Sequence, residues 1–289
     1  MNYSNNIEEA KKLLNLAEAV LITSGAGMSV DSGLPDYRSN LGIIATLKNK
    51  GYNYNELLTP YTFINHPYFI WGWYASQYKL FYNAKPHEGY YLLKNYIDQN
   101  NLEYFIYTSN IDCMWKKAGF DKKRIYECHG SMDHMQSMTN KGPIWSVKPE
   151  DIFKIEYDPV TYQCYPYTVP HSYYDGNIAR PNVYLFDDEK YFNTTRLYQA
   201  DVRFGNWYQK IALAKKRLVV IEIGAGTIIP TVREMSESVV NDHLIIGTIN
   251  DPSYSKLIRI NPSESQVPEG HISIPENGLK ALKDLFSKK

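Results

Sequence analysis

Residues 21–38 read Leu-Ile-Thr-Ser-Gly-Ala-Gly-Met-Ser-Val-Asp-Ser-Gly-Leu-Pro-Asp-Tyr-Arg. An apolar run, typical of a buried strand, ends here in a turn of small residues. Gly25 and Gly27 carry no side chain and can take positive φ, so the backbone of this turn can approach a phosphate. A helix beginning just after the turn would point its N–H groups and positive dipole end at the same anion. The stretch therefore predicts a phosphate-binding turn, and the alternative is an ordinary tight strand-to-helix turn.

Composition limits the classes of partner. The 289 residues include 31 basic and 31 acidic side chains, and a net charge of zero argues against nucleic acid as the main partner. The N-terminal residues are polar rather than leader-like, and no apolar run reaches the roughly 18 residues that a membrane helix needs. The three cysteines, Cys113, Cys128 and Cys164, are widely spaced and form no disulfide framework. We expect a cytoplasmic protein that binds neither nucleic acid nor membrane.

Strand and helix patterns alternate along the chain, which favours a doubly wound parallel sheet, an α/β fold of Rossmann-like type. Strands are predicted at residues 19–23, 103–107, 124–128, 182–186, 218–223 and 257–261. Helices are predicted at residues 87–99, 197–215, 231–240 and 276–286, and another is expected to begin at Asn6 as its N-cap.

Two long segments interrupt this alternation. Residues 41–80 are dense in aromatic side chains, and residues 133–179 are rich in Pro and Tyr with little periodicity. Structureless loops of that length are unusual inside a compact domain. We therefore interpret both segments as insertions that form a small second domain and a cleft. Residues 1–40, 81–132 and 180–289 then make up the Rossmann-like domain.

Two further motifs follow predicted strands, at the sheet edge where ligands bind in open α/β folds. The first is Tyr107-Thr-Ser-Asn-Ile-Asp-Cys113, in which Asn110 and Asp112 could hold a ribose hydroxyl and a carboxamide. The alternative is that they cap the next helix. The second is Tyr126-Glu-Cys-His-Gly-Ser131, where His129 is placed like a general base. Its alternative is a structural histidine.

Together the three motifs resemble those of the sirtuin family. Sirtuins carry Gly-Ala-Gly-x-Ser-x-x-Ser-Gly-Ile-Pro-Asp-Phe-Arg, then Thr-Gln-Asn-Ile-Asp, then His-Gly, and this chain has similar motifs in the same order. Residues 85–87, 180–186, 224–230 and 258–261 are also similar to family motifs. The resemblance extends over nearly the whole chain.

The resemblance implies an NAD-dependent protein lysine deacylase. Such an enzyme cleaves the nicotinamide–ribose bond of its co-substrate NAD and transfers the acyl group of an acylated-lysine protein or peptide to ADP-ribose. The catalytic residues it implies are His129, as the base that takes a proton from the ribose, with Asn110 and Asp112. The residues it places around NAD are Gly25, Ala26, Gly27, Asp36, Tyr37, Arg38, Ser109, Asn110, Asp112, Gly224, Gly226, Thr227 and Asn261. The loop Pro35–Arg38 is expected to close over the nicotinamide end.

The chain departs from the family at the zinc module. Family members usually hold a structural zinc with two Cys-x-x-Cys pairs after the His-Gly motif, and tetrahedral thiolate ligation needs four cysteines. Only Cys164 lies beyond Cys128 here, so we predict no metal site and no structural zinc. Packing must then stabilise the small domain. The expected material is a set of tyrosines: Tyr157, Tyr162, Tyr165, Tyr167, Tyr173 and Tyr174.

Two substitutions bear on the reaction. Ser109 stands where sirtuins usually have Gln, which could favour ADP-ribosyl transfer or plain NAD hydrolysis, or be a tolerated change. Asp187 replaces a Gly on the strand end that pairs with substrate peptides, and the acidic run 187–189 would favour basic substrates or be a solvated turn. Residues 63–82 are expected to line the acyl channel.

Two alternatives to deacylation therefore remain. One is a sirtuin-fold NAD glycohydrolase or ADP-ribosyltransferase. The other is a non-catalytic module that binds NAD or ADP-ribose, against which the intact His129 argues.

Overall fold

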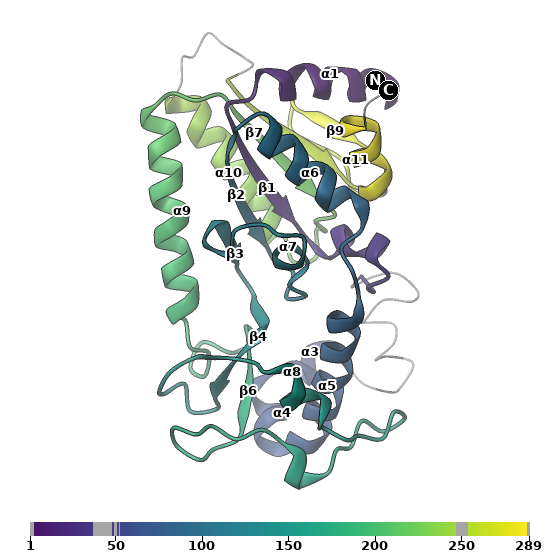
Figure 1. The fold of residues 1–289 in the computed structure, drawn as a ribbon, viewed down its shortest axis with the longest axis vertical. Helices are drawn as coiled ribbons and strands as arrows, with labels where there is room; N and C mark the ends of the chain where they lie inside the picture. The colour runs from purple at the N-terminus through teal and green to yellow at the C-terminus, as the bar shows by residue number, and fades with distance from the viewer. Residues whose placement is uncertain (1–2, 37–47, 49–50, 52, 247–253, 288–289) are drawn as a thin grey trace.

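The computed structural model describes residues 3–36, 48, 51, 53–246 and 254–287 (Figure 1). Its larger sheet has six strands, all paired in parallel, in the order β3-β2-β1-β7-β8-β9. The strands are β1 (Ala19–Ser24), β2 (Glu103–Thr108), β3 (Ile125–Glu127), β7 (Leu218–Ile223), β8 (Ser255–Ile260) and β9 (Ile272–Ile274). The predicted doubly wound parallel sheet is confirmed.

Helices cover both faces of this sheet because its central strands are apolar on both sides. Val20 and Ile22 of β1 belong to a core shared with α1 (Tyr3–Leu16), α6 (Glu88–Gln99) and α11 (Gly278–Phe286). Ala19 and Leu21 face the other way, into a core shared with α9 (Thr195–Leu213) and α10 (Thr231–Ile246). Figure 1 shows these two groups of helices on opposite sides of the strands.

A smaller, antiparallel sheet lies beyond the carboxyl ends of the large one, in the lower part of Figure 1. It has the order β5-β4-β6 and consists of β4 (Gly130–Ser137), β5 (Trp145–Ser146) and β6 (Ala179–Val183). The strand predicted at 182–186 therefore begins earlier and pairs with β4, within the small sheet. The helices beside it are α3 (Tyr54–Leu57), α4 (Pro60–Asn65), α5 (Pro67–Asn83) and α8 (Pro149–Phe153).

Aromatic packing holds this smaller unit together, but most of the expected tyrosines make their ring contacts at its surface rather than in its core. Tyr157 and Tyr162 are partly buried against the core. The four others are mostly solvent-exposed: Tyr165, Tyr167, Tyr173 and Tyr174. The buried anchor is Trp71 of α5, which is 1% exposed and donates its indole N–H to the carbonyl oxygen of Ala179 at 2.8 Å. This bond joins α5 to the start of β6.

Helix starts differ from expectation at the N-terminus. Asn6 is not an N-cap, because α1 already begins at Tyr3 and the Asn6 side chain donates to the carbonyl of Ser273 at 2.7 Å. His87 caps α6, its Nδ1 accepting from the Gly89 N–H at 3.0 Å.

Among the described helices, none is both long and apolar enough to span a bilayer.

Candidate active site

The strand order reverses between β1 and β7, and the loops that leave these two strands pack directly against each other. A Cβ at Gly25 would lie 2.7 Å from the carbonyl oxygen of Gly224, and one at Gly27 would lie 2.7 Å from the Gly224 Cα. Positive φ occurs at Gly224 (63°), whereas Gly25 has φ −109° and Gly27 is not left-handed. Gly25 and Gly27 therefore do not use the positive φ that glycine permits. The glycines are needed because two backbones touch at the switch point.

Where the two loops meet, hydrogen bonds engage two of the backbone N–H groups that were expected to face a phosphate. The Gly25 N–H donates to the carbonyl of Ile223 at 3.1 Å, and the Gly27 N–H donates to the carbonyl of Gly224 at 3.0 Å. Ala26, which begins the short 3-10 helix η1 (Ala26–Ser32), lies on the wall of a cavity instead. Of the predicted Gly-Ala-Gly contacts, Ala26 is thus the one that borders open space.

The cavity has a volume of about 280 Å³ and lies at the carboxyl ends of β1, β2 and β3. Its polar residues come mainly from the two predicted motifs, since Ser109, Asn110, Asp112 and His129 all line it. Its other walls are mainly apolar, apart from Gln77, and come largely from α5 and from the end of β6 and the residues after it: Trp73, Tyr74, Phe81, Val183, Leu185 and Phe186. The structure thus brings the second and third motifs to one hollow.

A buried hydrogen-bond network fixes the floor of this cavity. The Ser29 hydroxyl donates to Asp112 Oδ2 at 2.5 Å and accepts from the Asn110 side-chain amide at 3.2 Å and from the Tyr90 hydroxyl at 3.0 Å. Asp112 Oδ1 accepts from the Met114 N–H at 2.9 Å. Asp112 therefore binds the first N–H of α7 (Met114–Lys117), which follows its N-cap Cys113, and also lines the cavity.

Ser29 and Tyr90 are the members of this network to which the sequence analysis gave no role. A signal for Ser29 was available, because the family motif Gly-Ala-Gly-x-Ser has a serine at this position. Nothing in the sequence pointed to Tyr90, which reaches the site from α6.

Burial sets the protonation of the two titratable groups. It raises the pKa of Asp112, while the hydrogen bonds from Ser29 and Met114 act in the opposite direction. Burial lowers the pKa of His129, so its ring is neutral near neutral pH and can accept a proton.

Gly130 follows His129 with φ 78°, and a Cβ there would lie 2.1 Å from the carbonyl oxygen of Asn182. Only glycine lets the chain turn directly after His129 into β4.

The remaining predicted contacts gather beside the cavity, around the ends of β7 and β8. The Asn261 side chain donates to the carbonyl of Ala225 at 3.0 Å, which ties β8 to the loop containing Gly224 and Gly226. Thr227 donates to the Glu264 carboxylate through both its N–H (3.0 Å) and its hydroxyl (2.7 Å).

These four predicted residues, Gly224, Gly226, Thr227 and Asn261, therefore form one cluster at the switch point, outside the cavity lining. Asp36 is described and lies next to Pro35, which lines the cavity. Tyr37 and Arg38 lie outside the described residues.

The acidic run 187–189 is neither a wholly solvated turn nor a free acidic surface. Asp188 is 0% exposed and forms a two-oxygen ion pair with Arg180, also 0% exposed, with N···O distances of 2.7 and 2.5 Å. Asp187 and Glu189 are exposed. Asp187 has φ 54°, a left-handed conformation that explains why the corresponding sirtuin position is Gly. The run thus anchors the strand end that walls the cavity.

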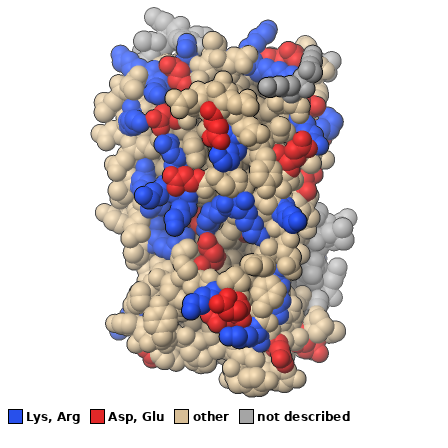
Figure 2. All heavy atoms as spheres, viewed as in Figure 1, with Lys and Arg blue, Asp and Glu red and all other residues tan. Residues whose placement is uncertain are grey.

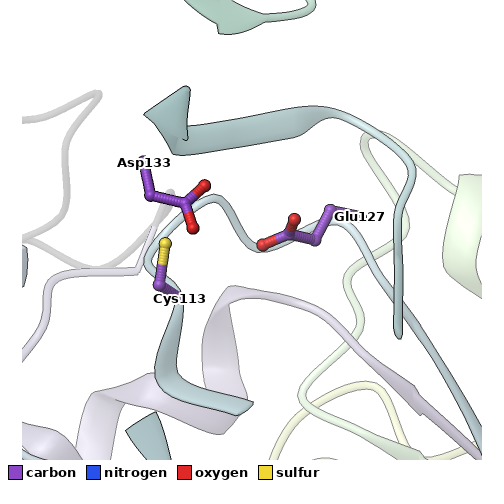
Figure 3. A group of neighbouring side chains, drawn as sticks. All are labelled: Cys113, Glu127 and Asp133. Carbon is purple, nitrogen blue, oxygen red and sulfur yellow. The ribbon is translucent and has the colours of Figure 1, made fainter. Parts of the chain in front are cut away.

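Cys113, Glu127 and Asp133 point toward one another with ligand atoms within 4.8 Å (Figure 3). A cation already occupies the middle of this group, because Lys116 Nζ lies 2.8 Å from Glu127 Oε1 and 2.7 Å from Asp133 Oδ2. Burial opposes the charge of Lys116, but the two carboxylates outweigh it and raise its pKa. Burial raises the pKa of Cys113 to about 12, so the thiol stays protonated and is a poor metal ligand. We interpret the group as a salt-bridge cluster.

Comparison with known proteins identifies the class. The Sir2 family model matches residues 25–205, and the chain belongs to this family, as its motifs predicted. An NAD-dependent protein deacetylase of Clostridium acetobutylicum is 29% identical over 184 residues, which cover 64% of this chain and 68% of that protein. An NAD-dependent protein deacylase of Thermococcus sibiricus is 23% identical over 269 residues, covering 88% of this chain and 96% of that one.

Solved structures agree on the fold. A Sir2 homologue in complex with NAD superposes with a TM-score of 0.70 at 19% identity, covering 96% of this chain and 92% of that one. A Sir2 protein solved with a p53 peptide and NAD⁺ gives a TM-score of 0.64 at 20% identity, covering 96% of this chain and 98% of that one. At this identity the likeness establishes the Sir2 fold alone.

Proposed function

We propose that the chain is an NAD-dependent protein lysine deacylase. The observation that carries the proposal is convergence: Asn110, Asp112 and His129, from the ends of two strands, line one cavity whose opposite wall is aromatic. The relatives named above are NAD-dependent deacetylases and deacylases, which supports the same reaction.

The residues present fit NAD. The cavity floor offers an amide and a carboxylate that Ser29 holds in place, and this pair suits a ribose hydroxyl and a planar carboxamide. The cluster at the switch point would meet the adenosine half of NAD; it consists of Gly224, Gly226, Thr227 and Asn261. When bound, NAD would supply a leaving group and an electrophilic ribose carbon.

The protein's own contribution is positioning and proton transfer. Ser29 locks Asn110 and Asp112 in one arrangement, so little reorganisation is needed on binding. A ring nitrogen of the neutral His129 takes the proton released from the ribose hydroxyl. The apolar wall from α5 and residues 183–186 excludes water and receives the acyl-lysine side chain. We further propose that the small domain folds without zinc and that the enzyme is cytoplasmic.

The test is to incubate the purified protein with NAD, with and without an acetyl-lysine peptide. Nicotinamide release that depends on the peptide, with formation of acyl-ADP-ribose, is the expected result. His129→Ala should abolish it while NAD binding persists; surviving activity would show that His129 is not the base. Elemental analysis checks the metal prediction, and stoichiometric zinc would overturn it.

A second reaction is favoured by one observation. Ser109 lines the cavity with a shorter side chain than the usual Gln, which would give water more access to the ribose carbon of a bound NAD. Equal nicotinamide release with and without peptide would establish NAD hydrolysis in place of deacylation.

A further inference from the structure

A second cavity, of about 390 Å³, lies on the face of the molecule that carries α9 and shares no lining residue with the first. Five basic side chains line it: Lys116, Lys122, Lys123, Arg196 and Arg203. They come from α7, from the turn before β3 and from the first half of α9. In Figure 2, Lys and Arg side chains gather at mid-height on the left, the side on which Figure 1 shows α9.

The carboxylates of this cavity are already engaged. Glu127 pairs with Lys116 at 2.8 Å and with Arg196 at 3.1 Å, and Asp133 pairs with Lys116 at 2.7 Å. The two acidic side chains therefore offset the two inner cations. Three positive charges are left over at the rim.

The rim cations have no carboxylate to meet in the described part of the chain. Lys122 and Lys123 are exposed, and neither ammonium is ion-paired to a described acidic residue. Arg203 donates its Nε–H to the carbonyl oxygen of Lys123 at 3.0 Å, and it lines the cavity together with the two lysines. The cavity therefore carries an excess of positive charge at its rim, which attracts anions, and a guanidinium beside ammonium groups matches the oxygens of phosphate.

We propose that this cavity binds a small anion that carries phosphate groups, at a site separate from the proposed NAD site. The hollow shape favours a small ligand over an extended acidic surface, because the basic side chains line one partly open cavity. The inner ion pairs keep Lys116 and Arg196 in place, so the site is formed before the ligand arrives.

Calorimetric titration of the full chain with inorganic pyrophosphate tests the proposal. We compare Lys122→Ala/Lys123→Ala with Lys12→Ala/Lys141→Ala, which removes the same charge from exposed lysines that do not line the cavity. The first variant should bind about tenfold or more weakly, since charge-assisted contacts are lost, and the second should bind like the unaltered protein. All four lysines are exposed, so both variants should fold, which circular dichroism checks.

Three results would overturn the proposal. The first is no binding of pyrophosphate to the unaltered protein. The second is equal binding to the two variants, which would place the anion elsewhere, including the proposed NAD site. A hexaglutamate peptide that binds more tightly than pyrophosphate, and loses its affinity in the Lys122/Lys123 variant, would identify the cavity as part of an acidic-partner surface instead.

Discussion

Asp188→Ala should strongly destabilise the protein, because it leaves the buried Arg180 without its counter-charge. Both side chains are 0% exposed, and Asp188 accepts two bonds from the guanidinium and one from the Leu185 N–H at 3.0 Å. Removing one partner of a buried ion pair costs about 3–5 kcal/mol. Since whole domains are stable by only about 5–15 kcal/mol, a substantial part of the free energy of unfolding would be lost.

Urea unfolding followed by far-UV circular dichroism measures this effect. The matched control is Glu189→Ala, one position further along the acidic run. Glu189 is exposed and its hydrogen bond with Tyr184 is 3.5 Å long, so its loss should change stability by no more than about 0.5 kcal/mol. A double variant, Arg180→Met/Asp188→Leu, should regain part of the loss because no unpaired charge stays buried.

The reasoning fails if Asp188→Ala costs less than about 1 kcal/mol, or if the Glu189 control costs as much. Either result would mean that the acidic run acts as a solvated turn. It would also remove the anchor that we assign to Leu185 and Phe186 on the cavity wall.

Three further predictions concern the cavity. Ser29→Ala should lower kcat/KM about 5- to 150-fold, because Asp112 and Asn110 lose a shared partner at a cost of roughly 1–3 kcal/mol, and steady-state kinetics that match the unaltered enzyme would contradict this. The acidic limb of the pH profile of kcat/KM should lie below 6.5, since burial lowers the pKa of His129 and the base acts only when neutral; a limb above 6.5 would argue against His129. Gln77→Leu should raise the preference for longer apolar acyl groups over acetyl several-fold without loss of stability, because Gln77 Oε1 is buried on the cavity wall with no hydrogen-bond partner among the described residues. Competition between acetyl and hexanoyl peptides measures this preference, and an unchanged ratio would place the acyl chain elsewhere.

The large sheet could be predicted because its strands carry their own signal. Residues 218–223 form an apolar run interrupted only by Glu222, and β7 spans the same residues. β9, by contrast, has only three residues, too few for a periodic pattern. The small sheet was missed for a different reason: β4 and β6 pair Ser131 with Asn182, and nothing local in either segment specifies a partner so distant in sequence.

The candidate site was predictable as a set of motifs but not as a network. Asn110, Asp112 and His129 could be chosen from strand ends alone, since those ends meet at one sheet edge. The role of Tyr90 could not, because its hydroxyl reaches Ser29 only through the packing of α6 on the sheet. Likewise the Asp187–Glu189 run looked uniform in sequence, and only the fold separates its buried middle residue from its exposed neighbours.

The glycines of the opening stretch show how a correct motif can rest on a different physical reason. The sequence suggested that Gly25 and Gly27 free their amides for a phosphate, yet both N–H groups bond to the end of β7. Their missing side chains instead permit contact between the loops that follow β1 and β7. A Cβ at Gly25 or Gly27 would lie only 2.7 Å from an atom of Gly224. That contact fixes the switch point as a rigid edge. The η1 helix, which begins at Ala26, is thereby held in place, and with it the Ser29 hydroxyl that orients Asp112. The turn acts on the site by positioning the residues that follow it.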